Sequence, residues 1–283
     1  MLIAQLTDIH IGFGPDGADE ETNKQRLRAV MTRLMDGPNR PDLLVLSGDL
    51  TEHGDVESYA ALAEMVAPCG VPVWPMVGNH DTRDALLELF AAVPPEDGFV
   101  HYVIERGGLR LVLLDTLELG RHGGAFCELR DAWLRRQLDA APETPTVIFM
   151  HHPPVVSGIE WMDPDPREPW IERFGAAVEG RRQILAIHCG HVHRTVATTF
   201  RGIPLGISPS VAPQVGLDLR PIGERTADGR ALIVAEPPAY ALHHWENGRL
   251  TTHYEVVGDW PVLAPYTAKL QGMVSDMLAE RRR

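Results

Sequence analysis

The chain of 283 residues has few cysteines, no long apolar run and no long basic run. Its three cysteines are scattered and form no C-x-x-C pair, which argues against a disulfide framework, a zinc ribbon and a thioredoxin-like motif. No apolar run approaches the length of a membrane span, so we expect no membrane partner. The formal net charge is −13 and Lys and Arg do not cluster, so we expect no nucleic-acid polymer as a partner.

The first eight residues lack the features of a secretion signal. They contain no basic n-region and no apolar h-region of signal length, and cleavage there would remove Asp8 and His10. Together with the scarcity of cysteine, this predicts a reduced, cytoplasmic location. The composition, 44% apolar and 23% charged, is that of an ordinary globular protein, and the length suits one large α/β domain or a domain with an appendage.

Short apolar runs alternate with longer amphipathic runs over the first two-thirds of the chain, which is typical of a layered α/β domain. The apolar runs predict strands at residues 2–6, 42–46, 71–77, 100–104, 109–114, 146–150 and 184–188. Helical spacing predicts helices at residues 20–35, 56–66, 84–92 and 128–138. The pattern then changes to short strands at 195–200, 231–235, 240–245 and 250–257, followed by a surface helix over 264–283.

Residues of metal-ligand type follow five of the apolar runs, so each group is expected where a strand ends and a loop begins. The groups are Asp8-x-His10, Gly48-Asp49, Gly78-Asn79-His80-Asp81, His151 and His191-x-His193. In extended backbone the alternate positions of D-x-H and H-x-H would project from one face. Carboxylates and imidazoles from successive strand ends would then converge on one edge of a sheet, as a pair of metal ions requires.

Each motif alone has an ordinary explanation. D-x-H occurs by chance in many chains, Asp49 could be a helix N-cap, and His191 and His193 could be a surface pair. A turn would explain Gly78-Asn79 but not the His-Asp that follows. The five groups in order are much more specific. Oxygen and imidazole donors without thiolate favour Mn, Fe, Zn or Co, because Ca and Mg prefer fewer imidazoles.

Taken together, these motifs resemble the signature of the calcineurin-like metallophosphoesterases over residues 8 to 193. Further segments resemble the bacterial class III branch of cyclic-nucleotide and glycerophosphodiester phosphodiesterases, namely residues 48–51, 78–83, 151–158 with 161–163, and 208–213. The resemblance implies a phosphoric diester hydrolase. The expected fold is a four-layer α/β/β/α sandwich of two mixed β-sheets flanked by helices, with a dinuclear metal site at the C-terminal strand edges.

The resemblance also implies a division of the chain. Residues 1–260 would form the catalytic domain, and residues 261–283 a helical tail. Within the domain, the strand-rich part at about 203–260 would complete the second sheet and could contribute a subunit interface to a homodimer or higher homo-oligomer.

Two divalent metal ions (Mn, Fe, Zn or Co) are the cofactors that the family implies. Carried over by position, Asp8, His10, Asp49 and His193 would hold the first ion. The second would be held by Asp49, Asn79, His151 and His191, so that Asp49 bridges the pair. A bridging hydroxide would attack phosphorus in line with the leaving group.

The residues of the G-N-H-D motif outside the ligand set have roles implied by the same resemblance. His80 would contact the phosphate and protonate the leaving group, with Asp81 orienting its ring. Asn79, His80 and Arg83 would contact the substrate, although Arg83 could instead pair with an acidic neighbour. The Trp161–Met162 loop could close over the site or contact another subunit.

The substrate is left open between 3′,5′-cyclic nucleotides such as cAMP and glycerophosphodiesters. A nuclease of the same superfamily is an alternative, against which the acidic charge counts. A non-catalytic metal-binding scaffold is another, against which the retained His80 and ligand set count. Among the other histidines, we expect His152 to support the ligands. His53 and His122 could line the substrate cleft, but a solvated loop position is the expected one.

Overall fold

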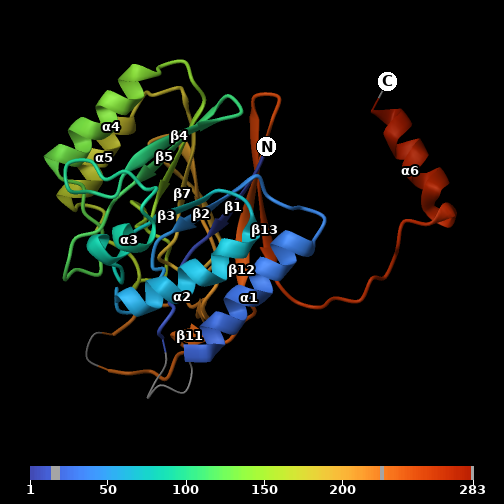
Figure 1. Ribbon diagram of the computed structural model, residues 1–283, viewed down its shortest axis with the longest axis horizontal. Helices are drawn as coiled ribbons and strands as arrows, with labels where there is room; N and C mark the ends of the chain where they lie inside the picture. The colour runs from blue at the N-terminus through green and yellow to red at the C-terminus, as the bar shows by residue number, and fades with distance from the viewer. Residues whose placement is uncertain (14–19, 224–225, 282–283) are drawn as a thin grey trace.

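The protein, seen in a computed structural model that describes residues 1–13, 20–223 and 226–281, is built in four layers. Two mixed β-sheets face each other, and helices cover the outer face of each (Figure 1). This arrangement confirms the predicted α/β/β/α sandwich.

The first sheet has the strand order β13-β12-β1-β2-β3. Its strands are β1 (Leu2–Leu6), β2 (Leu43–Ser47), β3 (Val73–Met76), β12 (Ala239–Glu246) and β13 (Arg249–Val256). β1, β2 and β3 run parallel, and β12 and β13 are antiparallel additions. The parallel strands β1 and β2 are buried almost throughout, which is why they read in the sequence as continuous apolar runs.

The second sheet has the order β4-β5-β6-β7-β9-β8. Its strands are β4 (Tyr102–Arg106), β5 (Leu109–Leu114), β6 (Thr146–Met150), β7 (Ile184–Cys189), β8 (Val196–Phe200) and β9 (Ile203–Ile207). β5, β6, β7 and β9 are parallel, whereas β4 and β8 are antiparallel strands at the two edges. A separate pair, β10 (Gln214–Val215) and β11 (Ile233–Val234), lies outside both sheets.

Alternation along the strands divides the apolar side chains between two cores. Leu111 and Leu113 of β5 point into the core shared with the first sheet, whereas Val112 and Leu114 point into the core beneath the outer helices. The first core also includes side chains from α1 (Glu20–Asp36), α2 (Val56–Val66) and α3 (Arg83–Leu89), and the second includes side chains from α4 (Glu128–Ala140) and α5 (Pro169–Val178). The helix layers are therefore held by apolar burial on both outer faces.

Local signals explain why several of these elements begin and end where they do. The Asp55 side chain accepts a hydrogen bond from the Ser58 amide and caps α2. The short 3-10 helix η2 (Ala67–Cys69) follows, and Gly70 ends it with a left-handed φ of 69°. Helix α5 was not expected from the sequence; it begins with Pro169 at its first position.

The strands of the C-terminal third do not all join the second sheet, although the sequence analysis expected them to. β9 completes the second sheet, but β12 and β13 join the first sheet through β1. The last helix, α6 (Ala268–Glu280), has no buried residue and stands apart from the layered body (Figure 1). Arg282 and Arg283, at the end of the expected helix, lie outside the described residues. Within the described ranges, no helix has the length and apolarity needed to cross a membrane.

Candidate metal centre

The five groups of ligand-type residues follow β1, β2, β3, β6 and β7, and the fold brings them to the same edge of the two sheets. Four groups of acid and imidazole side chains lie there, and within each group the ligand atoms are within 4.8 Å of one another. Asp8, His10 and His193 form one group, and Asp8, Asp49 and His151 form another. The predicted residues therefore converge from both sheets on one point between them.

Two buried carboxylates, Asp8 and Asp49, are the centre of this cluster. Asp8 Oδ1 lies 3.3 Å from His193 Nε2, and Asp49 Oδ2 lies 3.1 Å from His151 Nε2. Burial favours the neutral acids, but the nearby imidazoles outweigh it and hold the pKa of both carboxyl groups below the usual range. Burial also opposes charge on His151, yet the attraction of Asp49 raises its pKa to about 9. The two carboxylates are therefore ionised, and each lies beside an imidazole that favours its charged form.

Three of the imidazole rings are anchored through Nδ1 to an oxygen that can only accept. His151 Nδ1–H donates to Ser47 O at 2.9 Å, and His193 Nδ1–H donates to Pro213 O at 2.9 Å. His10 Nδ1–H donates to Glu52 Oε2 at 2.7 Å. In the neutral rings these bonds leave the Nε2 lone pair unprotonated and facing the carboxylates, which is the arrangement of a metal-ligating histidine.

The backbone at the predicted ligands is not extended. The sequence analysis expected extended backbone to place the alternate residues of D-x-H and H-x-H on one face, and this expectation was wrong. Asp8, His10, Asp49, His191 and His193 all have positive φ, between 48° and 72°. This left-handed region is uncommon for residues with a side chain and costs free energy unless the surrounding structure holds it. The D-x-H and H-x-H pairs therefore reach one site through loop geometry rather than through the alternation of a strand.

Two glycines allow the carboxylate of Asp49 to approach His151. A Cβ on Gly48 would lie 2.5 Å from His151 Nδ1, and a Cβ on Gly78 would lie 2.3 Å from Asp49 Oδ1. Gly48 also has a φ of 97°, which residues with a side chain rarely adopt. A methyl group at either position would displace the central pair.

The remaining predicted ligands, Asn79 and His191, lie beside a histidine that was expected to be solvated. His122 Nδ1 lies 3.3 Å from Asn79 Nδ2, and its ring is 4.6 Å from that of His191. Asn79 Oδ1 is buried without a hydrogen-bond partner in the described part of the chain. His152 lies on this side too: its Nδ1 is 2.8 Å from Thr116 Oγ1, and it forms a further group of possible metal ligands with His151 and His191.

Asp81 does not orient the ring of His80 as the family resemblance implied. Its carboxylate accepts hydrogen bonds from the backbone amides of Leu50, Thr51 and Gly78 and from the Tyr59 hydroxyl. It therefore ties together the loops after β2 and β3. Burial, followed by repulsion from Asp49, raises the pKa of this carboxyl group.

Arg83 is likewise not available to a substrate. Its guanidinium forms two hydrogen bonds with the buried carboxylate of Asp115, at 2.7 and 2.8 Å, and a third with Leu117 O. Asp115 in turn accepts from the amides of Val100 and Leu117. The acidic partner, which was the second possibility for Arg83, is the one the structure shows.

Glu52 was not identified from the sequence, yet it lies within this centre. Its carboxylate contacts His10, and its backbone oxygen accepts a hydrogen bond from His80 Nδ1 at 3.0 Å. Burial favours the neutral acid, but hydrogen bonding to His10 outweighs it and lowers the pKa of Glu52. Its position three residues after Asp49 was the only available signal, and an acid in a loop is usually solvated.

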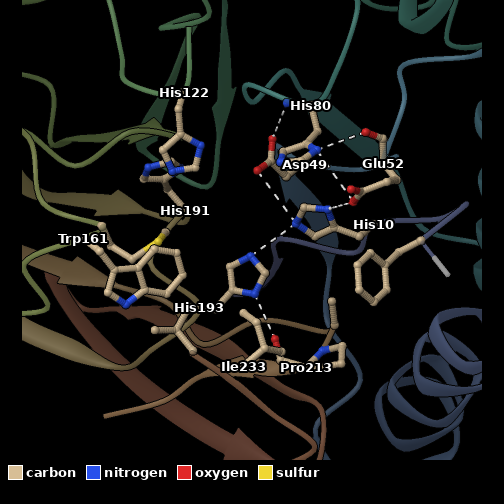
Figure 2. Close-up of a pocket in the computed structure, with 14 residues that line it drawn as sticks. His10, Asp49, Glu52, His80, His122, Trp161, His191, His193, Pro213 and Ile233 are labelled. Atoms are coloured by element: carbon tan, nitrogen blue, oxygen red, sulfur yellow. Dashed lines mark hydrogen bonds and ion pairs between the residues drawn. The ribbon is translucent and has the colours of Figure 1, made fainter. Parts of the chain in front are cut away.

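A pocket opens over the cluster and has two unlike sides. Figure 2 shows Glu52, His80 and His10 on one side and Trp161 on the opposite side, with Ile233 beyond His193. Apolar side chains complete the lining: Phe13, Met162, Ala212, Pro213 and Val215. The Trp161–Met162 segment therefore lines the pocket. No lysine or arginine is among the lining residues in the described ranges.

A divalent cation fits this donor set. It would be met by two ionised, buried carboxylates, by imidazole Nε2 atoms with fixed lone pairs, and by the unpaired amide oxygen of Asn79. Oxygen and nitrogen donors of this kind suit Mn, Fe, Zn and Co. The layered fold with such a cluster at its strand ends defines a class of metal-centred hydrolases.

Comparison with known proteins identifies the family within that class. A family model described as calcineurin-like phosphoesterase matches residues 1–195, and the chain belongs to this family. It is 33% identical to a probable glycerophosphodiester phosphodiesterase, GpdQ, of Arcobacter nitrofigilis, over 94% of this chain and 97% of that protein. It is 26% identical to the 3′,5′-cyclic adenosine monophosphate phosphodiesterase CpdA of Vibrio vulnificus, over 94% and 93%.

Solved structures show the same fold at low identity. A dimetal phosphatase from Danio rerio matches with a TM-score of 0.67 and 16% identity, over 92% of this chain and 97% of that chain. The family model and the 33% identical relative confirm the predicted family and the assignment as a metallophosphoesterase. The relatives' names support phosphodiester hydrolysis and include both substrate classes that the sequence left open.

Proposed function

We propose that this protein hydrolyses small phosphodiesters with two divalent metal ions. The observation that carries the proposal is the convergence of two buried carboxylates with imidazole rings whose Nε2 atoms face them. In this proposal Asp8, His10, Asp49 and His193 hold one ion, and Asp49, Asn79, His151 and His191 hold the other. When bound, ions of this kind would lower the pKa of a coordinated water to roughly 7, would supply a hydroxide nucleophile and would neutralise charge on the phosphate.

His80 is the proposed acid for the leaving group. Its side chain lines the pocket and is 30% exposed, so it can reach a substrate, whereas His10, His151 and His191 are buried. The Nδ1–H bond to Glu52 O directs Nε2 away from the loop. The Glu52 carboxylate also lies close to this ring, with Oε2 3.6 Å from the same Nδ1.

The pocket lining supports cyclic nucleotides over glycerophosphodiesters. Phe13 and Ile233 are 39% and 49% exposed, and Trp161 lines the same pocket, so apolar surface is available beside the cluster. A nucleobase could stack on such surface, whereas glycerol has no apolar face to bury.

The test is turnover by metal-free protein reconstituted separately with Mn, Fe, Co and Zn. We expect cyclic AMP to be hydrolysed faster than glycerophosphoethanolamine, and an activated monoester least. A Trp161→Ala variant should raise KM for cyclic AMP by about 5- to 150-fold, since base–aromatic stacking contributes about 1–3 kcal/mol, and should leave glycerophosphoethanolamine unaffected. Leu129→Ala, an exposed leucine on α4, is the matched control. No turnover of any diester with any metal would overturn the proposal.

A further inference from the structure

Glu52 contacts the Nδ1 atoms of two histidines, one through its side chain and the other through its backbone. The side chain accepts from His10 Nδ1 at 2.7 Å, whereas the main-chain oxygen accepts from His80 Nδ1 at 3.0 Å. The two rings lie edge to face with their centroids 4.7 Å apart. A proposed metal ligand and the proposed acid are thus both oriented by one residue (Figure 2).

The position of Glu52 is fixed by the loop that carries it. Its amide donates to Ile11 O at 2.9 Å, which places it directly beside the D-x-H segment. Thr51, the preceding residue, donates its amide to Asp81 and accepts from the Gly54 amide. The Glu52 side chain is 18% exposed, so solvent competes little for its contact with His10.

We propose that Glu52 is a positioning residue that fixes the tautomer of His10. By accepting from Nδ1, its carboxylate keeps the proton on that atom and leaves the Nε2 lone pair facing Asp49 and His193. In a free imidazole side chain the proton prefers Nε2, where it would block metal binding. The importance of this tautomer for catalysis rests on the proposed function, in which His10 holds a metal ion. The assignment of the tautomer is independent of that function.

Because Glu52 contacts His10 through its side chain and His80 through its backbone, a substitution of Glu52 should affect the two rings differently. Removing the carboxylate in Glu52→Ala deprives His10 of its acceptor but leaves the main-chain bond to His80 intact. Glu52→Gln keeps an acceptor oxygen at nearly the same place and removes the charge. His80 therefore serves as an internal reference for His10 within the same protein.

A direct metal ligand is the competing role for Glu52, because His10, Glu52 and His80 also lie close enough together to hold an ion. The two roles differ in their response to the amide. A positioning residue needs only an acceptor, so Glu52→Gln should restore it. A carboxylate ligand needs its charge, so Glu52→Gln should bind metal as poorly as Glu52→Ala.

The first experiment measures ring-nitrogen chemical shifts by long-range proton–nitrogen NMR on metal-free protein at pH 8.5. We expect His10 to carry its proton on Nδ1 in the wild type and in Glu52→Gln, and on Nε2 in Glu52→Ala. His80 should keep its Nδ1 proton in all three. Glu57→Ala, which removes an exposed acid on α2, is the matched control and should change neither ring.

The second experiment titrates manganese against a competing chelator. Glu52→Ala should weaken the tighter of the two binding steps by about 10- to 100-fold, the usual effect of losing a partner of a metal-ligating histidine, and Glu52→Gln by less than 3-fold. An unchanged His10 tautomer in Glu52→Ala, or equal losses of manganese affinity in both variants, would overturn the inference. Both readouts remain valid if no diester is hydrolysed, so failure of the proposed function is separable.

Discussion

The Tyr59 hydroxyl lies 2.7 Å from Asp81 Oδ1 and joins α2 to the loop that carries Asn79 and His80. Both side chains are buried, and Asp81 also binds three backbone amides from the loops after β2 and β3. The phenol is strongly perturbed: burial, followed by the charge of Asp81, raises the pKa of Tyr59. The hydroxyl is therefore a permanent donor to a carboxylate that shapes the site without touching it.

Tyr59→Phe should lower the free energy of unfolding by about 1.5–3 kcal/mol, because it removes a buried hydrogen bond to an acid. The measurement is urea unfolding of the metal-free protein. Tyr266→Phe is the control, since the Tyr266 side chain is exposed. Equal losses in the two variants would show that the Tyr59–Asp81 bond contributes nothing specific.

Asp115→Asn should destabilise the protein by about 3–5 kcal/mol, because it leaves the partly buried Arg83 guanidinium without its charged partner. Asp131→Asn on α4, which breaks a partly exposed pair with Arg135 four residues away, should cost only about 0.3–0.5 kcal/mol. Chemical unfolding of the two variants provides the comparison. A loss at Asp115 as small as that at Asp131 would contradict the structural role of this ion pair.

His80→Ala should reduce kcat by roughly 10²- to 10⁴-fold, the usual contribution of a general acid, while retaining bound metal. His151→Ala should instead lose metal, because His151 Nε2 lies 3.1 Å from Asp49 within the proposed ligand set. Elemental analysis of both purified variants, alongside their turnover, separates the two roles. Loss of metal in His80→Ala would show that His80 is a ligand.

His101→Phe should reduce the loss of stability on acidification. His101 is buried against Trp133, with ring centroids 4.0 Å apart, and neither of its ring nitrogens has a hydrogen-bond partner among the residues that the structure describes. Burial lowers its pKa to about 4 from the ordinary 6.5, so only the unfolded state takes up a proton between these values. The contribution of the neutral His101 ring to the free energy of unfolding is complete above pH 6.5. It falls by about 1–3 kcal/mol as the pH decreases towards 4.

Urea unfolding of metal-free protein at pH 7 and pH 4.5 measures this difference. The change in unfolding free energy between the two pH values should be smaller in His101→Phe than in the wild type. His253→Phe, at an exposed position on β13, should leave the change as it is in the wild type. An identical pH dependence in all three proteins would rule out a contribution from His101.

Local sequence patterns were sufficient for much of this fold. Continuous apolar runs predicted β1 and β2, and helical spacing predicted α2 over residues 56–66. Helix α5 escaped prediction although Trp170 and Phe174 anchor it in the second core. The sequence also did not predict which strands belong to which sheet. β12 pairs with β1, more than 230 residues away in the chain, and a local sequence pattern does not indicate such a distant partner.

The sequence by itself determined which donor atoms are available and the strand ends from which they come, because apolar runs and the residues that follow them are local properties. Only the tertiary structure decided how the donors meet. The left-handed backbone at Asp8 and His191 is held by loops from other strands, and Arg83 was removed from the site by Asp115. Glu52 and His122 joined the site because distant segments pack beside them, which spacing along the chain does not encode.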